Sequence, residues 1–338
     1  MKKWNGYQKG VNLGGWLSQT VLTKEHCDTF IIESDIENIR KMGFDHVRLP
    51  VDYELVQDKN GCFIDSGFVY IENCVEWCGK YGLNVVLDLH KAAGYCFDAK
   101  QKEAGLFYDE ELNCRFIALW TEFTRRFGRY ADRLSFELLN EVVDEADNAP
   151  WMALAERTVK EIRKTAPDIK ILIGSYLNNS VTTVKHIAQP FDENIVYNFH
   201  CYDPLLFTHQ GAYWLEDMPR DYRIQYPMGK AEFLTAAAEC PAKISAYEGE
   251  IPENGFSAEY FENIFREAVE TAQERDVMLY CGEYGVNELA DAESAVNWYR
   301  DIHSVLDKYG IGRAMWSYKG MDFGLSDGLL SCITERIV

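Results

Sequence analysis

The sequence predicts a (β/α)8 barrel, in which eight parallel strands close into an inner barrel and the connecting helices surround it. Two observations carry this prediction. Eight short apolar runs recur along the 338 residues, and amphipathic stretches of helical length separate most of them. In addition, polar side chains follow several of these runs, at the end of the strands where barrel proteins build their sites. We expect residues 1–338 to form one domain.

The expected strands are short, and the middle ones are apolar almost throughout, as strands buried on both faces should be. They span residues 9–16, 46–53, 83–90, 134–141, 169–176, 195–203, 277–285 and 313–320. The expected helices each have one apolar face. They span residues 33–42, 68–80, 110–130, 151–165, 258–274 and 292–308. An open, doubly wound sheet is the alternative, but the glycines of residues 10–15 lack the spacing of a dinucleotide-binding loop.

One connection between the expected strands is much longer than the others. The sixth run ends at residue 203 and the seventh at residue 285, which leaves room for an insertion of approximately residues 204–256 before the helix at 258–274. Because it follows the carboxyl end of a strand, we expect an inserted subdomain over that face of the barrel. Its aromatic and imidazole side chains could form a small core of their own or the wall of a cleft, Trp214 first; they are Phe207, His209, Tyr213, Trp214, Tyr222 and Tyr226.

Charge and aromatic content narrow the choice of partner. The chain has 54 acidic and 34 basic residues, a net charge of −20, which disfavours binding to a nucleic-acid backbone. A neutral sugar polymer carries no such penalty, and the aromatic fraction of 14% suits stacking against sugar rings. The apolar runs are too short to span a membrane. This composition is compatible with a polysaccharide or oligosaccharide partner and disfavours a nucleic-acid or membrane partner. Separately, we expect a monomer.

The cysteines and the N-terminal segment favour the cytoplasm. Residues 1–10 carry positive charge, but no continuous apolar segment of a signal peptide follows them. The ten cysteines are scattered, and several lie within apolar runs, as buried thiols do in a reducing compartment. If a leader has been removed, the protein is instead secreted. Cys74 and Cys78 are four residues apart on an expected helix, and without a second pair nearby we expect helix packing there rather than a metal site.

Polar and aromatic side chains gather where the expected strands end. They are Arg48, His90, Asn140, Glu141, His200, Tyr202, Glu283 and Trp316. Each alone has a structural explanation, such as a hydrogen-bonded histidine or a tryptophan in the core. Together they are hard to explain by packing, because each buried and unpaired polar group costs kcal/mol of stability. Two carboxyl groups that face each other across a barrel mouth, here Glu141 and Glu283, are the minimum needed to hydrolyse a glycosidic bond.

The chain resembles glycoside hydrolase family 5, the cellulase family, and in particular its clostridial endoglucanase C type. The motifs that carry this resemblance run nearly from end to end: residues 10–16 (GVNLGGW), 43–50 (GFDHVRLP), 136–141 (FELLNE), 196–200 (VYNFH), 279–285 (LYCGEYG), and Trp316 with 321–323 (MDF). All eight residue types of the family's active site occur in chain order. The resemblance implies a barrel with its catalytic carboxylates on strands four and seven.

The resemblance also implies a role for each residue. Glu141 would be the general acid/base, with a raised pKa, and Glu283 the ionised nucleophile. The other six would support them: Arg48 and Tyr202 hold Glu283, Asn140 binds the sugar 2-hydroxyl, His90 and His200 position hydroxyls and the acid, and Trp316 is a platform for the ring. Trp214 and Asn12 are possible additional sugar contacts. No metal and no organic cofactor is implied.

We expect a retaining endo-β-glucanase that cleaves β-1,4 linkages in soluble β-1,4- or mixed β-1,3/1,4-glucans. An exo-β-1,3-glucosidase or a β-mannanase on the same scaffold is the alternative, because the family spans them. A non-catalytic carbohydrate-binding barrel is a further alternative, but it would lack one of the two carboxylates. A phosphate-binding metabolic barrel would need a glycine-rich loop after strand seven or eight. Lys91 stands where related enzymes often carry a second histidine, which leaves the linkage preference open.

Overall fold

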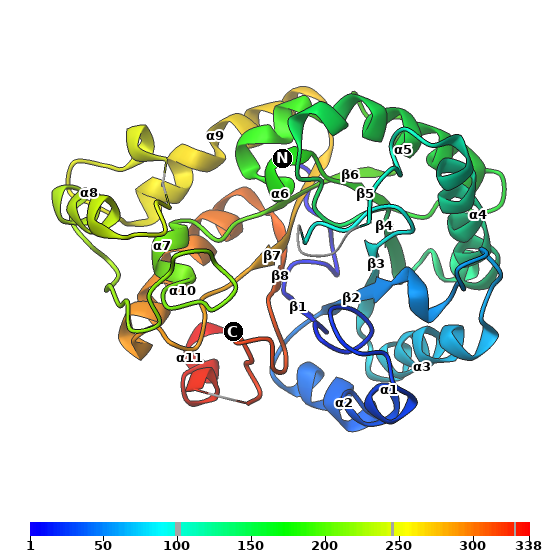
Figure 1. Cartoon of the computed structure of the whole chain (residues 1–338), viewed down its shortest axis with the longest axis horizontal. Helices are drawn as coiled ribbons and strands as arrows, with labels where there is room; N and C mark the ends of the chain where they lie inside the picture. The colour runs from blue at the N-terminus through cyan, green and yellow to red at the C-terminus, as the bar shows by residue number, and fades with distance from the viewer. Residues whose placement is uncertain (99–102, 245–246, 328) are drawn as a thin grey trace.

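The computed structural model describes residues 1–98, 103–244, 247–327 and 329–338, and its eight strands form a closed parallel barrel in chain order (Figure 1). Each strand pairs with the next, and β8 pairs with β1 to close the ring. The predicted fold class is therefore confirmed. The strands are β1 (Gly10–Asn12), β2 (His46–Asp52), β3 (Asn84–Lys91), β4 (Leu134–Glu137), β5 (Ile171–Ile173), β6 (Ile195–His200), β7 (Met278–Tyr284) and β8 (Gly312–Met315).

Helices surround the barrel, as predicted (Figure 1). Those that the sequence predicted are α2 (Glu33–Lys41), α3 (Asp65–Tyr81), α4 (Glu110–Phe127), α5 (Asn148–Arg163), α9 (Ala258–Glu274) and α10 (Ala292–Tyr309). The others are α1 (Lys24–Thr29), α7 (Leu205–Thr208), α8 (Lys230–Glu239), α11 (Thr334–Ile337) and the single turn α6 (Tyr176–Asn179), whose backbone is partly left-handed. Short 3-10 helices complete the elements: η1 (Tyr53–Leu55), η2 (Gly128–Tyr130), η3 (Glu145–Asp147), η4 (Val181–His186), η5 (Glu248–Glu250) and η6 (Leu329–Cys332).

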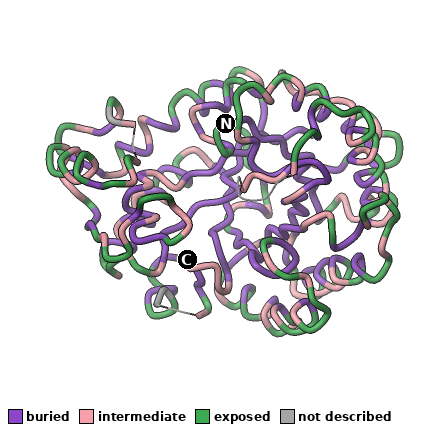
Figure 2. The backbone as a smooth tube through the Cα atoms, viewed as in Figure 1, coloured by how far each residue is buried: buried purple, intermediate pink, exposed green. Residues whose placement is uncertain are grey.

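The core lies between the barrel and the inner faces of these helices. In Figure 2 the central strands are buried, whereas the outer helices alternate between buried and exposed turns. α10 shows how the sequence sets this pattern. Trp298, Ile302 and Val305 recur at helical spacing and are buried against the barrel. The Asp291 side chain accepts from the backbone N–H of Ser294 and starts this helix.

Several strands end earlier than the sequence predicted. β4 ends at Glu137, so Asn140 and Glu141 stand on the loop that follows it. This loop still contacts the neighbouring strand, because the backbone N–H of Asn140 donates to the carbonyl oxygen of Leu89 at 3.1 Å. The polar residues that extended the expected strands therefore belong to loops at the carboxyl end of the barrel, where they are free to face a cavity.

The insertion lies between β6 and α9, as predicted, but it shares the main core. The buried ring of Phe207 packs on Tyr226, and Tyr226 and Phe233 pack on Phe256. Phe256 in turn contacts Tyr260 of α9 at a centroid distance of 4.7 Å. The aromatic residues of the insertion thus divide into two groups. One group packs against α9, and the other, with Trp214, lines the main cavity.

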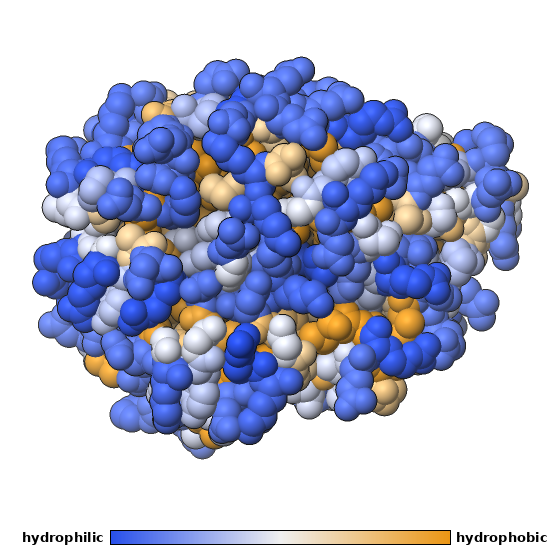
Figure 3. Space-filling model, turned by 180° about the vertical axis from the view of Figure 1, so that it is seen from behind, coloured by the Kyte–Doolittle hydropathy of each residue, from blue (hydrophilic) through white to orange (hydrophobic). Residues whose placement is uncertain are grey.

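The surface is largely hydrophilic in the view from behind, and its apolar side chains are scattered in small groups (Figure 3). Of the helices in the described part of the chain, none is long and apolar enough to cross a membrane. Cys74 and Cys78 are buried in the core on α3, which confirms the expectation of helix packing. Cys27, Cys201, Cys240 and Cys281 are also buried thiols.

A close backbone contact on α3 gives a test of the packing. A Cβ atom on Gly67 would lie 1.9 Å from the carbonyl oxygen of Leu55, whereas one on Gly79 of the same helix would lie 3.2 Å from the adaptable Arg133 side chain. Gly67→Ala should therefore lower the free energy of unfolding by about 1–3 kcal/mol, measured by urea denaturation. Gly79→Ala is the matched control and should be far milder. Equal stability of both variants would contradict the close approach of α3 to Leu55.

Candidate active site

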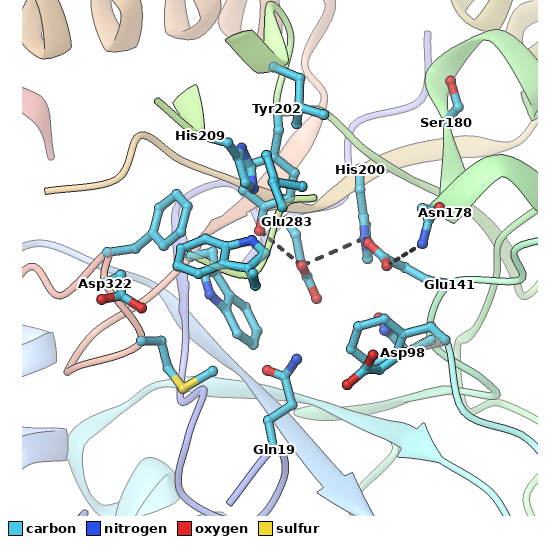
Figure 4. A pocket seen from close by; sticks show the side chains of 18 of the residues that line it. Gln19, Asp98, Glu141, Asn178, Ser180, His200, Tyr202, His209, Glu283 and Asp322 are labelled. Atoms are coloured by element: carbon cyan, nitrogen blue, oxygen red, sulfur yellow. Dashed lines mark hydrogen bonds and ion pairs between the residues drawn. The ribbon is translucent and has the colours of Figure 1, made fainter. Parts of the chain in front are cut away.

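Loops at the carboxyl ends of the strands enclose a cavity of about 730 Å³ (Figure 4). Seven of the eight side chains predicted from the strand ends line it: His90, Asn140, Glu141, His200, Tyr202, Glu283 and Trp316. The eighth, Arg48, is fully buried and contacts two of these residues. The structure therefore brings together residues from six strands or the loops that follow them.

Arg48 on β2 pairs with three buried carboxyl groups. Its Nη1 donates to Glu283 at 2.7 Å, its Nε and Nη2 donate to the two oxygens of Glu137, each at 2.7 Å, and its Nη2 lies 3.0 Å from Asp88. Burial by itself would lower the pKa of Arg48, but the three carboxyl groups hold it well above its usual value. Burial also raises the pKa of Asp88 to about 7, against the charge of Arg48. Arg48 is thus a permanent positive charge below the cavity.

Two asparagines complete the environment of Arg48. Nη1 of Arg48 donates to the amide oxygen of Asn12, and the amide nitrogen of Asn12 donates to the carbonyl oxygens of Gly282 and Ala314 at 3.0 and 3.1 Å. Asn12 is fully buried below the cavity, which corrects the expectation that it contacts sugar. The amide oxygen of Asn140 accepts from Nη2 of Arg48 at 2.9 Å. Its NH2 group is therefore the part that can donate to a ligand.

Glu283 on β7 is oriented by two donors. Arg48 binds its Oε1, and the hydroxyl of Tyr202 donates to its Oε2 at 2.9 Å. Burial and the negative charge of Glu283 hold the pKa of Tyr202 well above its usual value, so the hydroxyl remains a donor. The carboxylate is fixed in one plane, with only 5% of the residue exposed at the cavity floor.

Glu141 has a different environment. Its Oε1 lies 2.8 Å from Nδ1 of His200, and its Oε2 accepts a hydrogen bond from the amide of Asn178 at 2.9 Å (Figure 4). Burial raises the pKa of Glu141, while the Asn178 amide opposes the shift. Burial lowers the pKa of His200 to about 4, so this imidazole is neutral near pH 7. Glu141 is therefore suited to hold a proton.

Glu141, His200 and Glu283 each offer a ligand atom within 4.8 Å of the others, a spacing that could hold a metal ion. Their surroundings fit proton chemistry better. Every oxygen of the two carboxyl groups already has a partner in Arg48, Tyr202, His200 or Asn178. A bound cation would have to displace these donors beside the fixed charge of Arg48.

Aromatic side chains form the walls. Trp316, which follows β8, stacks on His90 with the ring centroids 5.9 Å apart and the planes at 10°. Trp214 of the insertion lines the same cavity and contacts Phe323 and the imidazole of His209. Flat apolar faces of this kind suit the C–H bonds of a pyranose ring.

Lys91 lies outside the main cavity. It forms an ion pair with Glu54 and lines a side pocket of about 410 Å³ together with Asp52. The side pocket and the main cavity share Phe97 as a lining residue. Lys91, where the chain departs from the pattern of the family it resembles, therefore lies beside the main cavity.

Sequence reasoning missed four residues that support the site. Asp88 and Glu137 were visible as charged residues within apolar runs, which is a signal of buried ion pairing. Asn178 has only a weak signal, an Asn-Asn pair that favours a left-handed turn. Tyr95, whose hydroxyl donates to the carbonyl oxygen of Glu141 at 2.8 Å, has no signal in a single sequence.

A closed (β/α)8 barrel whose mouth holds two buried carboxyl groups, one next to an arginine and the other with a raised pKa, defines a glycoside hydrolase. The chain belongs to the cellulase family, glycosyl hydrolase family 5, which residues 5–322 match. It is 43% identical to Cellodextrinase A of Ruminococcus flavefaciens over 93% of this chain and 86% of that protein. It is 41% identical to Endoglucanase C of Acetivibrio thermocellus over 98% of this chain and 97% of that protein.

The fold is also that of solved cellulase-family structures. The crystal structure of endoglucanase Cel5A from Thermotoga maritima matches with a TM-score of 0.76 and 23% identity, over 98% of this chain and 97% of that one. The resemblance predicted from the sequence motifs is therefore confirmed.

Proposed function

We propose that this protein is a retaining endo-β-glucanase that cleaves β-1,4 linkages in soluble β-1,4- or mixed β-1,3/1,4-glucans. The observation that carries the mechanism is the short spacing of the two carboxyl groups, since an oxygen of Glu141 and one of Glu283 lie within 4.8 Å of each other. Retaining enzymes hold their carboxyl groups about 5–5.5 Å apart, whereas inverting enzymes need about 6.5–9.5 Å to admit a water between them. The spacing supports direct attack by a carboxylate.

In the first step the Glu283 carboxylate attacks the anomeric carbon, and the bond from this carbon to the glycosidic oxygen breaks. Glu141 gives its proton to that oxygen, so the leaving chain departs as a neutral alcohol. In the second step the Glu141 carboxylate takes a proton from water, and the water oxygen attacks the anomeric carbon. The bond to Glu283 breaks and the nucleophile is released. Two inversions return the β configuration.

Two observations support the proposed substrate: the residues that line the cavity and the names of the related proteins. Asn140 and Trp316 both line the cavity, and the amide oxygen of Asn140 is held by Arg48. The Asn140 NH2 group would donate to the 2-hydroxyl of the reacting sugar, and Trp316 would provide a face for its ring. Relatives that match most of the chain are named an endoglucanase and a cellodextrinase, which favours β-glucan chains and their soluble oligosaccharides. An exo-β-1,3-glucosidase or a β-mannanase is the alternative.

Product analysis tests the proposal. Barley β-glucan and carboxymethylcellulose should be cut within the chain, with a rapid fall in viscosity, and laminarin and mannan should be poor substrates. NMR of the first products should show the β anomer before mutarotation. An initial α anomer would refute the double displacement, and preferred cleavage of laminarin or mannan would support the alternative.

The two carboxyl roles can be separated by substitution. Glu141→Ala should still form the glycosyl-enzyme from an activated aryl cellobioside, because a good leaving group needs no acid. Added azide should then raise the turnover and give a β-glycosyl azide. Glu283→Gln is the matched control and should be inactive on every substrate, with or without azide. Equal and unrescued loss in both variants would contradict the assignment.

Trp214 should affect long chains more than short ones. Trp214→Ala should lower kcat/KM for β-glucan by about tenfold, the effect of losing roughly 1.4 kcal/mol of stacking, and should leave short aryl glycosides nearly unchanged. The thermal midpoint of the variant reports that the fold is intact. Unchanged kinetics on both substrates would show that Trp214 only packs against the insertion.

A further inference from the structure

The backbone that carries Glu141 is fixed from one side by Tyr95. Glu141 has a positive φ of 26°, which is unusual for a residue other than glycine. The hydroxyl of Tyr95 donates to the carbonyl oxygen of Glu141 at 2.8 Å and accepts from the N–H of Val143 at 2.9 Å. These bonds hold the main chain of the turn. The carboxyl group at the end of the side chain needs further partners.

One of those partners comes from an unusual turn after β5. Leu177, Asn178 and Asn179 are three consecutive residues in the left-handed region, with φ between 51° and 55°. Asparagine tolerates this region, but leucine does so only at a cost in energy. The turn is tied to the chain that follows Glu141, since the N–H groups of Leu177 and Asn178 donate to the carbonyl oxygens of Val143 and Val142 at 3.1 and 3.0 Å.

This arrangement directs one side chain at the acid. Nδ2 of Asn178 lies 2.9 Å from Oε2 of Glu141, on the side of the carboxyl group away from His200 (Figure 4). His200 can donate or accept at Nδ1 according to its tautomer, whereas the Asn178 NH2 group can only donate. The hydrogen bond from Asn178 therefore favours forms of Glu141 in which Oε2 carries no proton.

We propose that Asn178 is a positioning residue that stabilises the carboxylate form of Glu141, so that the residue can change from acid to base between the two steps. This inference rests on the double displacement proposed above. In the first step Glu141 must hold a proton, and burial supports that form. In the second step it must take a proton from water, which burial alone would oppose.

Other polar groups around Glu141 do not replace this donor. Those that face it or bear on its charge are Arg48 from β2, Asp88 and His90 from β3, His200 from β6, Tyr202 after β6, and Glu283 from β7. Arg48 is already shared among three carboxyl groups. His200 is neutral near pH 7, because burial lowers its pKa to about 4. Asn178 is the neighbour that donates directly to Oε2 and carries no charge that titrates.

The test is Asn178→Gly, which removes the amide but keeps a residue that adopts the left-handed turn. Loss of one hydrogen bond to a charged group should raise the pKa of Glu141 by about one unit. With 2,4-dinitrophenyl β-cellobioside, hydrolysis of the glycosyl-enzyme limits kcat, and this step needs Glu141 as the carboxylate. The acid limb of kcat should then move about one pH unit higher. With cellotetraose, which needs the protonated acid, the alkaline limb of kcat/KM should move in the same direction.

Two matched variants make the test specific. Leu177→Gly changes the same turn and keeps the amide, so both limbs should stay in place. Asn178→Asp keeps the size and places a second carboxyl group beside Glu141, so both limbs should move further upward. A stable Asn178→Gly enzyme whose limbs remain at the wild-type pH would overturn the inference.

Failure of this inference is distinguishable from failure of the proposed function. The acid limb of kcat on the aryl substrate must be absent from Glu141→Ala, because that limb reports the base. A limb that survives in Glu141→Ala would contradict the assignment of Glu141 itself. A limb that Glu141→Ala removes, and that Asn178→Gly leaves unmoved, would contradict only the role of Asn178.

Discussion

The buried charge of Arg48 is the constraint on which the rest of the site depends. Removal of a guanidinium from water is costly unless every donor is paired, and here Asp88, Glu137 and Glu283 supply the acceptors. These partners come from β3, β4 and β7, so the charge can be satisfied only if the barrel is closed with its strands in the observed register. The same bonds that stabilise the charge also fix where the Glu283 carboxylate faces the cavity.

The two carboxyl groups at the mouth differ because only one of them is bonded to this charge. Glu283 accepts directly from Arg48 and from Tyr202, and both bonds favour the carboxylate. Glu141 accepts from neutral groups, and burial raises its pKa. His200 lies near both, at 2.8 Å from Glu141 and 3.7 Å from Glu283. Because burial lowers the pKa of His200, its imidazole adds no positive charge near pH 7, and the two carboxyl groups keep their different environments.

The sequence predicted the barrel and the residues at its mouth because both follow from local patterns. Apolar runs of strand length show where the strands lie, and a polar residue at the end of such a run shows where the site lies. The sequence did not show which side chains face the cavity. Asn12 resembles a sugar ligand in its motif, but its oxygen accepts from Arg48 and its amide holds the backbone of β7 and β8. That assignment depends on the packing of strands far apart in the chain.

The residues that support Glu141 could not be predicted from the sequence for a related reason. Asn178 meets Glu141 because the turn after β5 is left-handed and is bonded to the loop after β4. A left-handed conformation at three consecutive residues, one of them a leucine, contradicts local preference. It is stable only because neighbouring loops impose it, and a single sequence does not encode those neighbours in any local pattern.

One aromatic cluster connects the insertion to Glu283. Tyr202, which holds Oε2 of Glu283, packs edge-on against His209 and Phe323 at centroid distances of 5.1 and 5.9 Å. Trp214 contacts the same two rings. A sugar ring that stacks on Trp214 would therefore lie against the same cluster as Tyr202. The proposed platform at Trp214 and the hydroxyl that donates to Glu283 therefore belong to one packed layer of rings.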